Sequence, residues 1–357
     1  MRILAACSLG GAGHWIPLSG VLDAAAQRGD DVLVAGPPAL GDMVRGHGFS
    51  FTAGGEPPEA VIAPLRDRLA VASPADASVI GNRDLFGRHA ATAMLEPLAD
   101  DTRRFRPDVI VRDPCEYASA VVATVEGIPM AQVAISLARI EWGSLAVASP
   151  ALEERTPGLT TAIRSSPYLS GFPETLDPSP FPTTLRFRGP NRPALQSLPD
   201  WWEGASAPLV YATLGTVLPH MSAALDHYRL LIDALADIDA RVLLTIGRHI
   251  EPSSLGSVPD HVRVEQWVDQ IEVFPDAALT VCHGGSGTLF GSLAAGVPVL
   301  VLPSFADQFA NADLVEHHRL GRVVRPESHG DERRPLRSAD RDRITTAITT
   351  CLLYTSP

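Results

Sequence analysis

Short apolar runs alternate with amphipathic stretches along this chain, a pattern that predicts strands alternating with helices. In the first half, the pattern predicts strands at Ile3 to Cys7, Asp31 to Ala35, Val109 to Val111 and Met130 to Ile135, with helices at Leu18 to Gln27 and Ala118 to Glu126. Two segments, Phe49 to Gly87 and Ser136 to Leu185, lack clean periodicity. We expect these two to be irregular surface or excursions over a binding site.

The second half repeats the alternation. It predicts strands at Leu209 to Leu214, Arg241 to Ile246, Val262 to Gln266, Leu279 to Cys282, Val299 to Leu302 and Arg322 to Val324, and helices at Ser222 to Leu235, Leu289 to Ala295 and Asn311 to His318. We therefore predict an α/β protein of two doubly wound, Rossmann-like domains facing a cleft. The predicted division is a first domain at 1–190, a linker at 191–205 and a second domain at 206–357.

Composition and charge narrow the class of protein. The length of 357 residues favours two domains, and the net charge of -12 without a basic cluster argues against a nucleic-acid partner. The four cysteines lie far apart without metal-ligand spacing, which favours reduced thiols in the cytoplasm. No apolar stretch approaches the ~20 residues of a membrane span, and the N-terminus lacks the apolar region of a signal peptide. The oligomeric state, a homodimer included, stays open.

A glycine-rich turn, His283-Gly284-Gly285-Ser286-Gly287-Thr288, joins a predicted strand to a predicted helix. Small residues let backbone N–H groups approach an anion, and the helix start adds unpaired donors and a positive dipole end. A phosphate or diphosphate site is one interpretation, and an ordinary tight turn is the other. The N-terminal loop, Ser8 to Gly13, lacks the glycine spacing of a dinucleotide fingerprint, so we expect no nicotinamide or flavin.

Six motifs follow one another along most of the chain: Gly13-His14 after the first strand, Pro107 to Pro114, Val210 to Thr216, Trp267 to Gln270, His283 to Thr288 and Pro303 to Asn311. In this order and spacing they resemble the GT-B nucleotide-sugar-dependent glycosyltransferases, in particular the actinobacterial natural-product branch related to UDP-sugar transferases. The resemblance implies a metal-independent, inverting hexosyltransferase without a cofactor. Such an enzyme moves a sugar, a deoxysugar in this case, from a dTDP- or UDP-sugar to a hydroxyl of a small hydrophobic acceptor.

The resemblance also implies roles for individual residues. The donor diphosphate would be held by Thr216, His283, Gly284, Gly285, Ser286, Gly287 and Thr288, and the nucleoside by Arg248, Trp267, Val268 and Gln270. Asp307 and Gln308 would bind sugar hydroxyls. His14 would act as general base, with Asp113 orienting it. Packing at a strand end is the alternative for His283, and a helix cap is the alternative for Asp307. For Asp113 the alternative is a helix cap or a turn former.

Two departures from the family pattern carry expectations of their own. Gly291 stands where many UDP-sugar transferases have a glutamate that binds the ribose hydroxyls, which favours a dTDP-sugar over a UDP-sugar. The chain stops before the helices that cross back onto the first domain, so we expect a truncated second domain. The remaining alternatives are a nucleotide-sugar epimerase of the same fold and a non-catalytic homologue that binds a nucleotide sugar or activates a partner transferase.

Overall fold

The structure is a computed structural model that describes residues 1–9, 11–188, 198–221, 223–326, 328–329, 332–333 and 336–355. Gly10 and residues 191–197 of the predicted linker lie outside the described residues. The chain divides into two compact units, Met1–Pro190 and Asn191–Pro357. No helix within the described residues combines the length and apolarity that crossing a bilayer requires.

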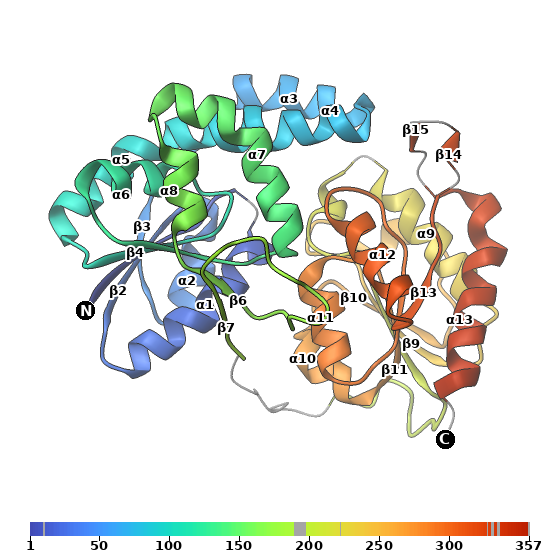
Figure 1. The fold of residues 1–357 in the computed structure, drawn as a ribbon. Helices are drawn as coiled ribbons and strands as arrows, with labels where there is room; N and C mark the ends of the chain where they lie inside the picture. The colour runs from blue at the N-terminus through green and yellow to red at the C-terminus, as the bar shows by residue number, and fades with distance from the viewer. Residues whose placement is uncertain are drawn as a thin grey trace. The chain divides into compact units, whose positions relative to one another are not determined.

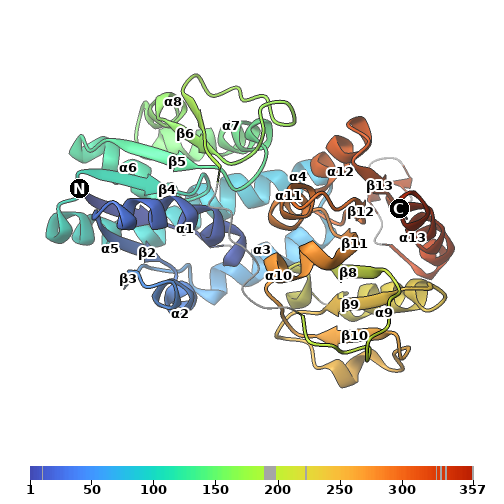
Figure 2. The same ribbon diagram turned by 90° about the horizontal axis from the view of Figure 1, so that it is seen from below.

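The first unit is built around a seven-stranded sheet in the order β3-β2-β1-β4-β5-β6-β7, with all neighbours parallel (Figures 1 and 2). Its elements are β1 (Arg2–Ala6), α1 (Ala12–Gln27), β2 (Asp31–Gly36), η1 (Pro38–Leu40), α2 (Gly41–Gly46), β3 (Ser50–Ala53), α3 (Glu59–Val71), α4 (Pro74–Ser78), the π-helical η2 (Val79–Ala90), α5 (Ala91–Phe105), β4 (Val109–Arg112), α6 (Ala118–Glu126), β5 (Met130–Val133), α7 (Ala138–Arg155), α8 (Leu159–Ser165), β6 (Tyr168–Ser170) and β7 (Thr184–Arg186).

Side-chain alternation along β1 explains why helices cover both faces of this sheet. Ile3 and Ala5 belong to the core that includes Trp15 of α1. Leu4 and Ala6 point the other way, into the core formed with α5 and α6. The strand order reverses between β1 and β4, which creates the switch point where ligands of doubly wound sheets bind.

The two segments predicted to be irregular are largely regular, so that prediction was wrong. Phe49 to Gly87 contains β3, α3, α4 and most of η2, and Ser136 to Leu185 contains α7, α8, β6 and the start of β7. The buried face of α7 carries small alanines and Glu141, which hides the apolar periodicity that sequence reasoning relies on. α1 also begins at Ala12, earlier than the predicted Leu18, so His14 lies in its first turn.

The second unit is built around a six-stranded parallel sheet in the order β10-β9-β8-β11-β12-β13. Its elements are β8 (Leu209–Thr213), η3 (Leu218–His220), α9 (Ala224–Leu235), β9 (Arg241–Thr245), η4 (Pro252–Leu255), β10 (Val262–Glu265), α10 (Gln270–Val273), η5 (Phe274–Asp276), β11 (Ala277–Cys282), α11 (Ser286–Ala294), β12 (Val299–Val301), α12 (Gln308–His317), β13 (Gly321–Val323), the paired β14 (Ser328–His329) and β15 (Glu332–Arg333), η6 (Ser338–Asp340) and α13 (Arg341–Thr355).

This sheet is also covered on both faces. Val210 and Ala212 of β8 pack into a core with α9 and α13, whereas Leu209 and Tyr211 face Phe274 on the other side. The strand order reverses between β8 and β11, so the loops after these two strands meet at the switch point. The predicted pair of doubly wound sheets is therefore confirmed. The predicted absence of crossover helices stays a prediction.

Candidate functional site

In the first unit, His14 and Asp113 meet at the switch point. β1 leads into the loop before α1, which carries His14 in its first turn, and Asp113 directly follows β4, the neighbour of β1. The Nδ1 atom of His14 lies 3.3 Å from Oδ1 of Asp113; the side chain of Asp113 is fully buried and that of His14 is 16% exposed. The ring of Phe86 stacks on the His14 ring at a centroid distance of 6.0 Å.

Ser8 completes this arrangement, and sequence reasoning missed it. Its backbone N–H donates to Oδ2 of Asp113 at 2.6 Å, and its hydroxyl lies 3.2 Å from Oδ1 of Asp113 and 3.1 Å from Nδ1 of His14. The backbone N–H of Cys115 also donates to Asp113 Oδ1, at 2.7 Å. The only signal in the sequence was the position of Ser8 directly after the predicted strand Ile3 to Cys7, where side chains face the switch point.

These donors decide the charge of Asp113. Burial opposes ionisation of the carboxyl, but the neighbouring His14 and the backbone N–H groups of Ser8 and Cys115 outweigh it, so the pKa of Asp113 is lowered. The carboxylate is therefore ionised at neutral pH and holds the Nδ1 edge of the imidazole. Because these contacts are made by Nδ1, Nε2 is the ring nitrogen that can exchange a proton with a substrate.

Three potential metal ligands also gather here. Ligand atoms of His14, Asp113 and Cys115 lie within 4.8 Å of one another. The Asp113 carboxylate accepts hydrogen bonds from the backbone N–H groups of Ser8 and Cys115. The predicted independence of metal stays a prediction.

In the second unit, the glycine-rich turn begins α11 at the end of β11. Gly285 is the N-cap residue and has no side chain with which to cap the helix start, and the first turn of α11 holds no acidic residue. Gly284 has φ +88°, and a Cβ there would lie 2.7 Å from Val301 Cγ1, so only glycine fits. Uncapped first-turn N–H groups at a switch point are suited to an anion.

The ring of His283 lies between two glycines. A Cβ on Gly215, after β8, would lie 2.5 Å from the ring, and a Cβ on Gly285 would also lie 2.5 Å from Nε2. Burial lowers the pKa of His283 to about 4, and the nearby backbone of Thr213 only partly offsets this effect. Within the described residues, Nδ1 is buried without a hydrogen-bond partner. His283 is therefore a neutral imidazole at pH 7. Its ring fits in this position because Gly215 and Gly285 have no side chains.

Asn311 ties the turn to the next loop and was missed as a site residue. Its amide nitrogen donates to the carbonyl of Gly284 at 2.7 Å and to the hydroxyl of Ser286 at 3.0 Å, and lies 3.5 Å from Asp307 Oδ2. The Ser286 hydroxyl in turn donates to Asp307 at 3.1 Å. The predicted diphosphate and sugar residues are thus joined by a buried amide one helical turn after Asp307.

Gln308 has a structural task in this loop. Its Oε1 accepts hydrogen bonds from the N–H groups of Ser304 at 2.9 Å and Phe305 at 3.0 Å. The side chain of Gln308 is buried. Ala306, which lies between Phe305 and Gln308, adopts φ 52°, a strained value for a residue with a Cβ. Gln308 therefore shapes the loop that presents Asp307, and only its amide N–H groups remain for a ligand.

Of the predicted nucleoside residues, Trp267 and Val268 lie on the loop after β10, Gln270 begins α10, and Arg248 lies on the loop after β9. Trp267 is 56% exposed, and the guanidinium carbon of Arg248 lies 5.3 Å from its ring centroid. Gln270 begins α10 and accepts a hydrogen bond at 3.0 Å from Thr288 in the first turn of α11. Val268 between them packs half-buried beside the Tyr211 core. An exposed indole flanked by a cation is suited to stacking on a base. Thr216 is exposed after β8.

Gly291 faces an aromatic ring. A Cβ at this position would lie 2.7 Å from Cε2 of Phe274, a buried residue of η5 directly after α10. A larger side chain at 291 therefore requires Phe274 to move. The structure thus has an apolar ring beside the place where the family pattern has a carboxylate.

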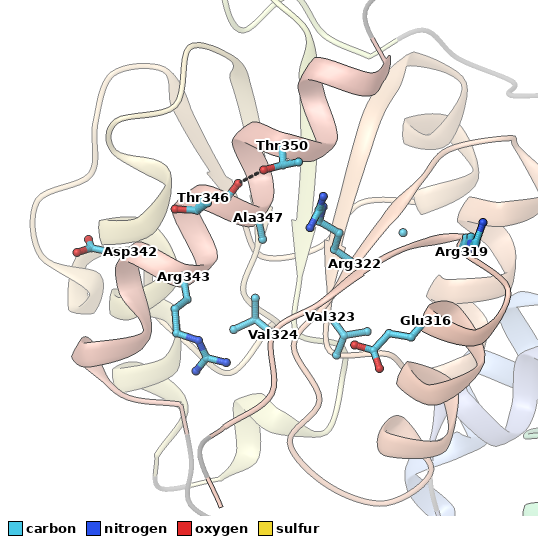
Figure 3. Close-up of a pocket in the computed structure, with 11 residues that line it drawn as sticks. Glu316, Arg319, Arg322, Val323, Val324, Asp342, Arg343, Thr346, Ala347 and Thr350 are labelled. Carbon is cyan, nitrogen blue, oxygen red and sulfur yellow. Dashed lines mark hydrogen bonds between the residues drawn. The ribbon is translucent and has the colours of Figure 1, made fainter.

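A separate hollow of about 820 Å³ lies where α12, β13 and α13 meet (Figure 3). Val324 and Ala347 give it apolar walls, and Glu316, Arg322 and Arg343 bring charges to it. None of the predicted site residues lines this hollow.

Comparisons with known proteins add a family context. Residues 229–347 match the family described as erythromycin biosynthesis protein CIII-like, C-terminal domain. L-demethylnoviosyl transferase from Streptomyces niveus is 32% identical over 326 residues, covering 88% of this chain and 82% of the relative. The elloramycin glycosyltransferase of Streptomyces olivaceus is 31% identical over 340 residues, covering 90% and 85%.

Solved structures share the fold. A spinosyn rhamnosyltransferase matches with a TM-score of 0.78 at 21% identity, covering 99% of this chain and 92% of that chain. The same enzyme has been solved in complex with thymidine diphosphate and with spinosyn aglycone. The glycosyltransferase SnogD from Streptomyces nogalater matches with a TM-score of 0.71 at 24% identity, covering 99% and 93%.

Proposed function

Because this chain belongs to the glycosyltransferase family of these Streptomyces relatives, whose fold is GT-B, we propose that it moves a sugar from a dTDP-sugar to a hydroxyl of a small hydrophobic acceptor, with inversion at the anomeric carbon. The observation that carries the proposal is the uncapped start of α11 beside the neutral His283 at the switch point of the second sheet. Such a place suits the diphosphate of a nucleotide sugar.

The donor half of the reaction belongs to the second unit. The N–H groups at the start of α11 and an N–H of His283 would donate to diphosphate oxygens, and the helix dipole would stabilise the charge that develops as dTDP departs. Thr216 would add a hydroxyl donor. Trp267 would stack on the thymine, and Asp307 would accept from sugar hydroxyls.

The acceptor half belongs to the first unit. Nε2 of His14 would take the proton of the acceptor hydroxyl as the oxygen attacks the anomeric carbon, and the bond to the diphosphate breaks with its electron pair leaving on dTDP. Asp113, ionised and hydrogen-bonded to Ser8 and Cys115, would keep Nδ1 of His14 protonated and stabilise the imidazolium. The reaction consumes no cofactor other than the nucleotide sugar.

The choice of dTDP over UDP rests on Gly291. With Phe274 filling the neighbouring space, this part of the site offers no carboxylate to a ribose 2′-hydroxyl. A deoxyribose loses nothing by that absence, whereas a buried 2′-hydroxyl would lack a partner. That a spinosyn rhamnosyltransferase of the same fold has been solved with thymidine diphosphate supports this choice.

The test is a mass-spectrometric screen of dTDP- and UDP-sugars against polyketide alcohols and phenols. We expect a glycosylated product with dTDP-sugars, and tighter binding of dTDP than of UDP in a calorimetric titration. Donor incubated alone tests for an epimerase, since an epimerised nucleotide sugar without transfer would overturn the proposal. Binding of dTDP with neither transfer nor donor hydrolysis would indicate a non-catalytic homologue. The cytoplasmic location stays a prediction.

A further inference from the structure

Arg112, the last residue of β4, has a fully buried side chain. A buried guanidinium must find hydrogen-bond acceptors, because its charge is costly to remove from water. Its Nε donates to the carbonyl of Glu116 at 2.6 Å and its Nη2 to the carbonyl of Pro114 at 2.9 Å. Its Nη1 donates to Gln132 Oε1 at 3.3 Å.

Two of these three acceptors belong to the loop that follows Asp113. The loop leads from β4 into α6, and the Glu116 carboxylate at its far end accepts from the N–H groups of Ala118 at 3.0 Å and Ser119 at 2.8 Å. Arg112, at the end of β4, therefore holds the loop through two of its backbone carbonyls, while the Glu116 carboxylate holds the loop against the start of α6. Asp113 is the loop residue between Arg112 and these anchored carbonyls.

The third acceptor is itself fixed. Gln132 pairs with Arg112 in the β4–β5 register, and its amide nitrogen donates to the carbonyl of Ile163 at 3.0 Å. This orients Oε1 towards the guanidinium. The planar guanidinium of Arg112 donates to three oxygens whose positions are fixed. A lysine ammonium cannot reproduce this geometry.

We propose that Arg112 is a positioning residue for the reaction: by binding the carbonyls of Pro114 and Glu116 it holds the loop in the shape that brings Asp113 to His14. The inference rests on the proposed function, because the reaction makes use of that contact. Arg112 itself touches neither reactant. A displacement of Asp113 by about 1 Å is enough to lower a positioned reaction about 10²-fold.

The experiment compares Arg112→Met and the conservative Arg112→Lys with Asp113→Asn and with the double variant Arg112→Met/Asp113→Asn. Each is assayed with the alcohol acceptor and the phenolic acceptor that react fastest in the screen, and each is titrated with dTDP. We expect Arg112→Met to lower kcat for the alcohol about 10²-fold, with a smaller loss for the more acidic phenol and unchanged dTDP affinity. Arg112→Lys should be intermediate. In the Asp113→Asn background, Arg112→Met should add little.

Arg186→Lys is the matched control. Arg186 also donates to a backbone carbonyl of the first unit, that of Phe172 at 2.8 Å, and lies on β7 away from the Asp113 loop. We expect this variant to unfold at a lower temperature without changing the ratio of alcohol to phenol turnover.

Four results would overturn the inference. Equal losses for alcohol and phenol with Arg112→Met, or a full additional loss in the Asp113→Asn background, would make Arg112 merely structural. A folded Arg112→Lys variant with wild-type turnover would show that the fork is not needed. If Asp113→Asn itself leaves alcohol transfer unchanged, the proposed role of the dyad fails, and this inference fails with it.

Discussion

Replacing Gly285 by alanine tests whether the fixed position of His283 matters for diphosphate binding. Gly285 has φ −62° and ψ 136°, values that alanine adopts without strain. The added Cβ would nevertheless lie 2.5 Å from Nε2 and 2.8 Å from Cε1 of His283. Ordinary contacts between such atoms are about 3.5 Å, so the ring must move by about 1 Å.

The size of the effect follows from the hydrogen bond that moves. A hydrogen bond to a charged phosphate contributes about 1.5–3 kcal/mol, which corresponds to a roughly 10–150-fold weaker Kd for dTDP. Isothermal titration with dTDP measures this directly. Gly143→Ala in α7 is the control, because a Cβ there meets nothing within 4 Å; it should leave the dTDP affinity unchanged.

A double-variant cycle shows whether the loss passes through His283. In the His283→Ala background, Gly285→Ala should cost little more, because there is no ring left to displace. Wild-type affinity in Gly285→Ala together with a large loss in His283→Ala would refute the packing argument. Wild-type affinity in both variants would remove His283 from the diphosphate site.

Three further predictions follow from the site. The pKa of His283 is about 4 in the folded protein against 6.5 for a free histidine, so the unfolded chain binds the proton first and stability falls as the pH drops from about 6.5 to 4, by roughly 3 kcal/mol. Denaturant unfolding at pH 7 and pH 4.5 should show a smaller fall for His283→Gln; an identical fall contradicts the assignment. Trp267→Ala should weaken dTDP binding by about 1–3 kcal/mol while Trp267→Phe retains most of it, and equal losses would exclude stacking. His14→Ala should lower transfer to an alcohol by about 10²–10⁴-fold at unchanged dTDP affinity, and wild-type turnover would end its role as the base.

The sequence predicted the six strands of the second sheet and four of the seven strands of the first, because buried parallel strands read as continuous apolar runs. It missed β3, β6 and β7, which lie wholly or partly in the two segments expected to be irregular. It failed at α7 and at α3, α4 and η2, three of the helices between β3 and β4. The segment that contains α3 and α4 is rich in proline, yet Pro58 and Pro74 stand at helix starts, where proline is tolerated, and Pro64 is accommodated inside α3. The buried Glu141 in α7 broke its apolar stripe, although its carboxylate accepts hydrogen bonds from the N–H groups of Ile135 and Ser136.

Among site residues, the sequence indicated those with a distinctive type at a strand end, such as His14, Asp113 and His283. It gave no sign of Asn311 or Arg112. Their importance lies in which backbone carbonyls they reach, and a polar residue in a sequence shows only that it has hydrogen-bonding capacity. Predicting them would have required the path of two loops in three dimensions.

What the sequence by itself determined is the alternation of strand and helix, hence two doubly wound sheets and the placing of glycines, histidines and carboxylates after particular strands. What the tertiary structure alone decided is their pairing. Ser8 reaches Asp113 across 105 positions of chain because β1 and β4 are neighbours, and Phe274 meets Gly291 because η5 packs against α11. Local pattern reports on burial and backbone preference, whereas contacts between distant segments depend on strand order and helix packing, which form only when the whole domain folds.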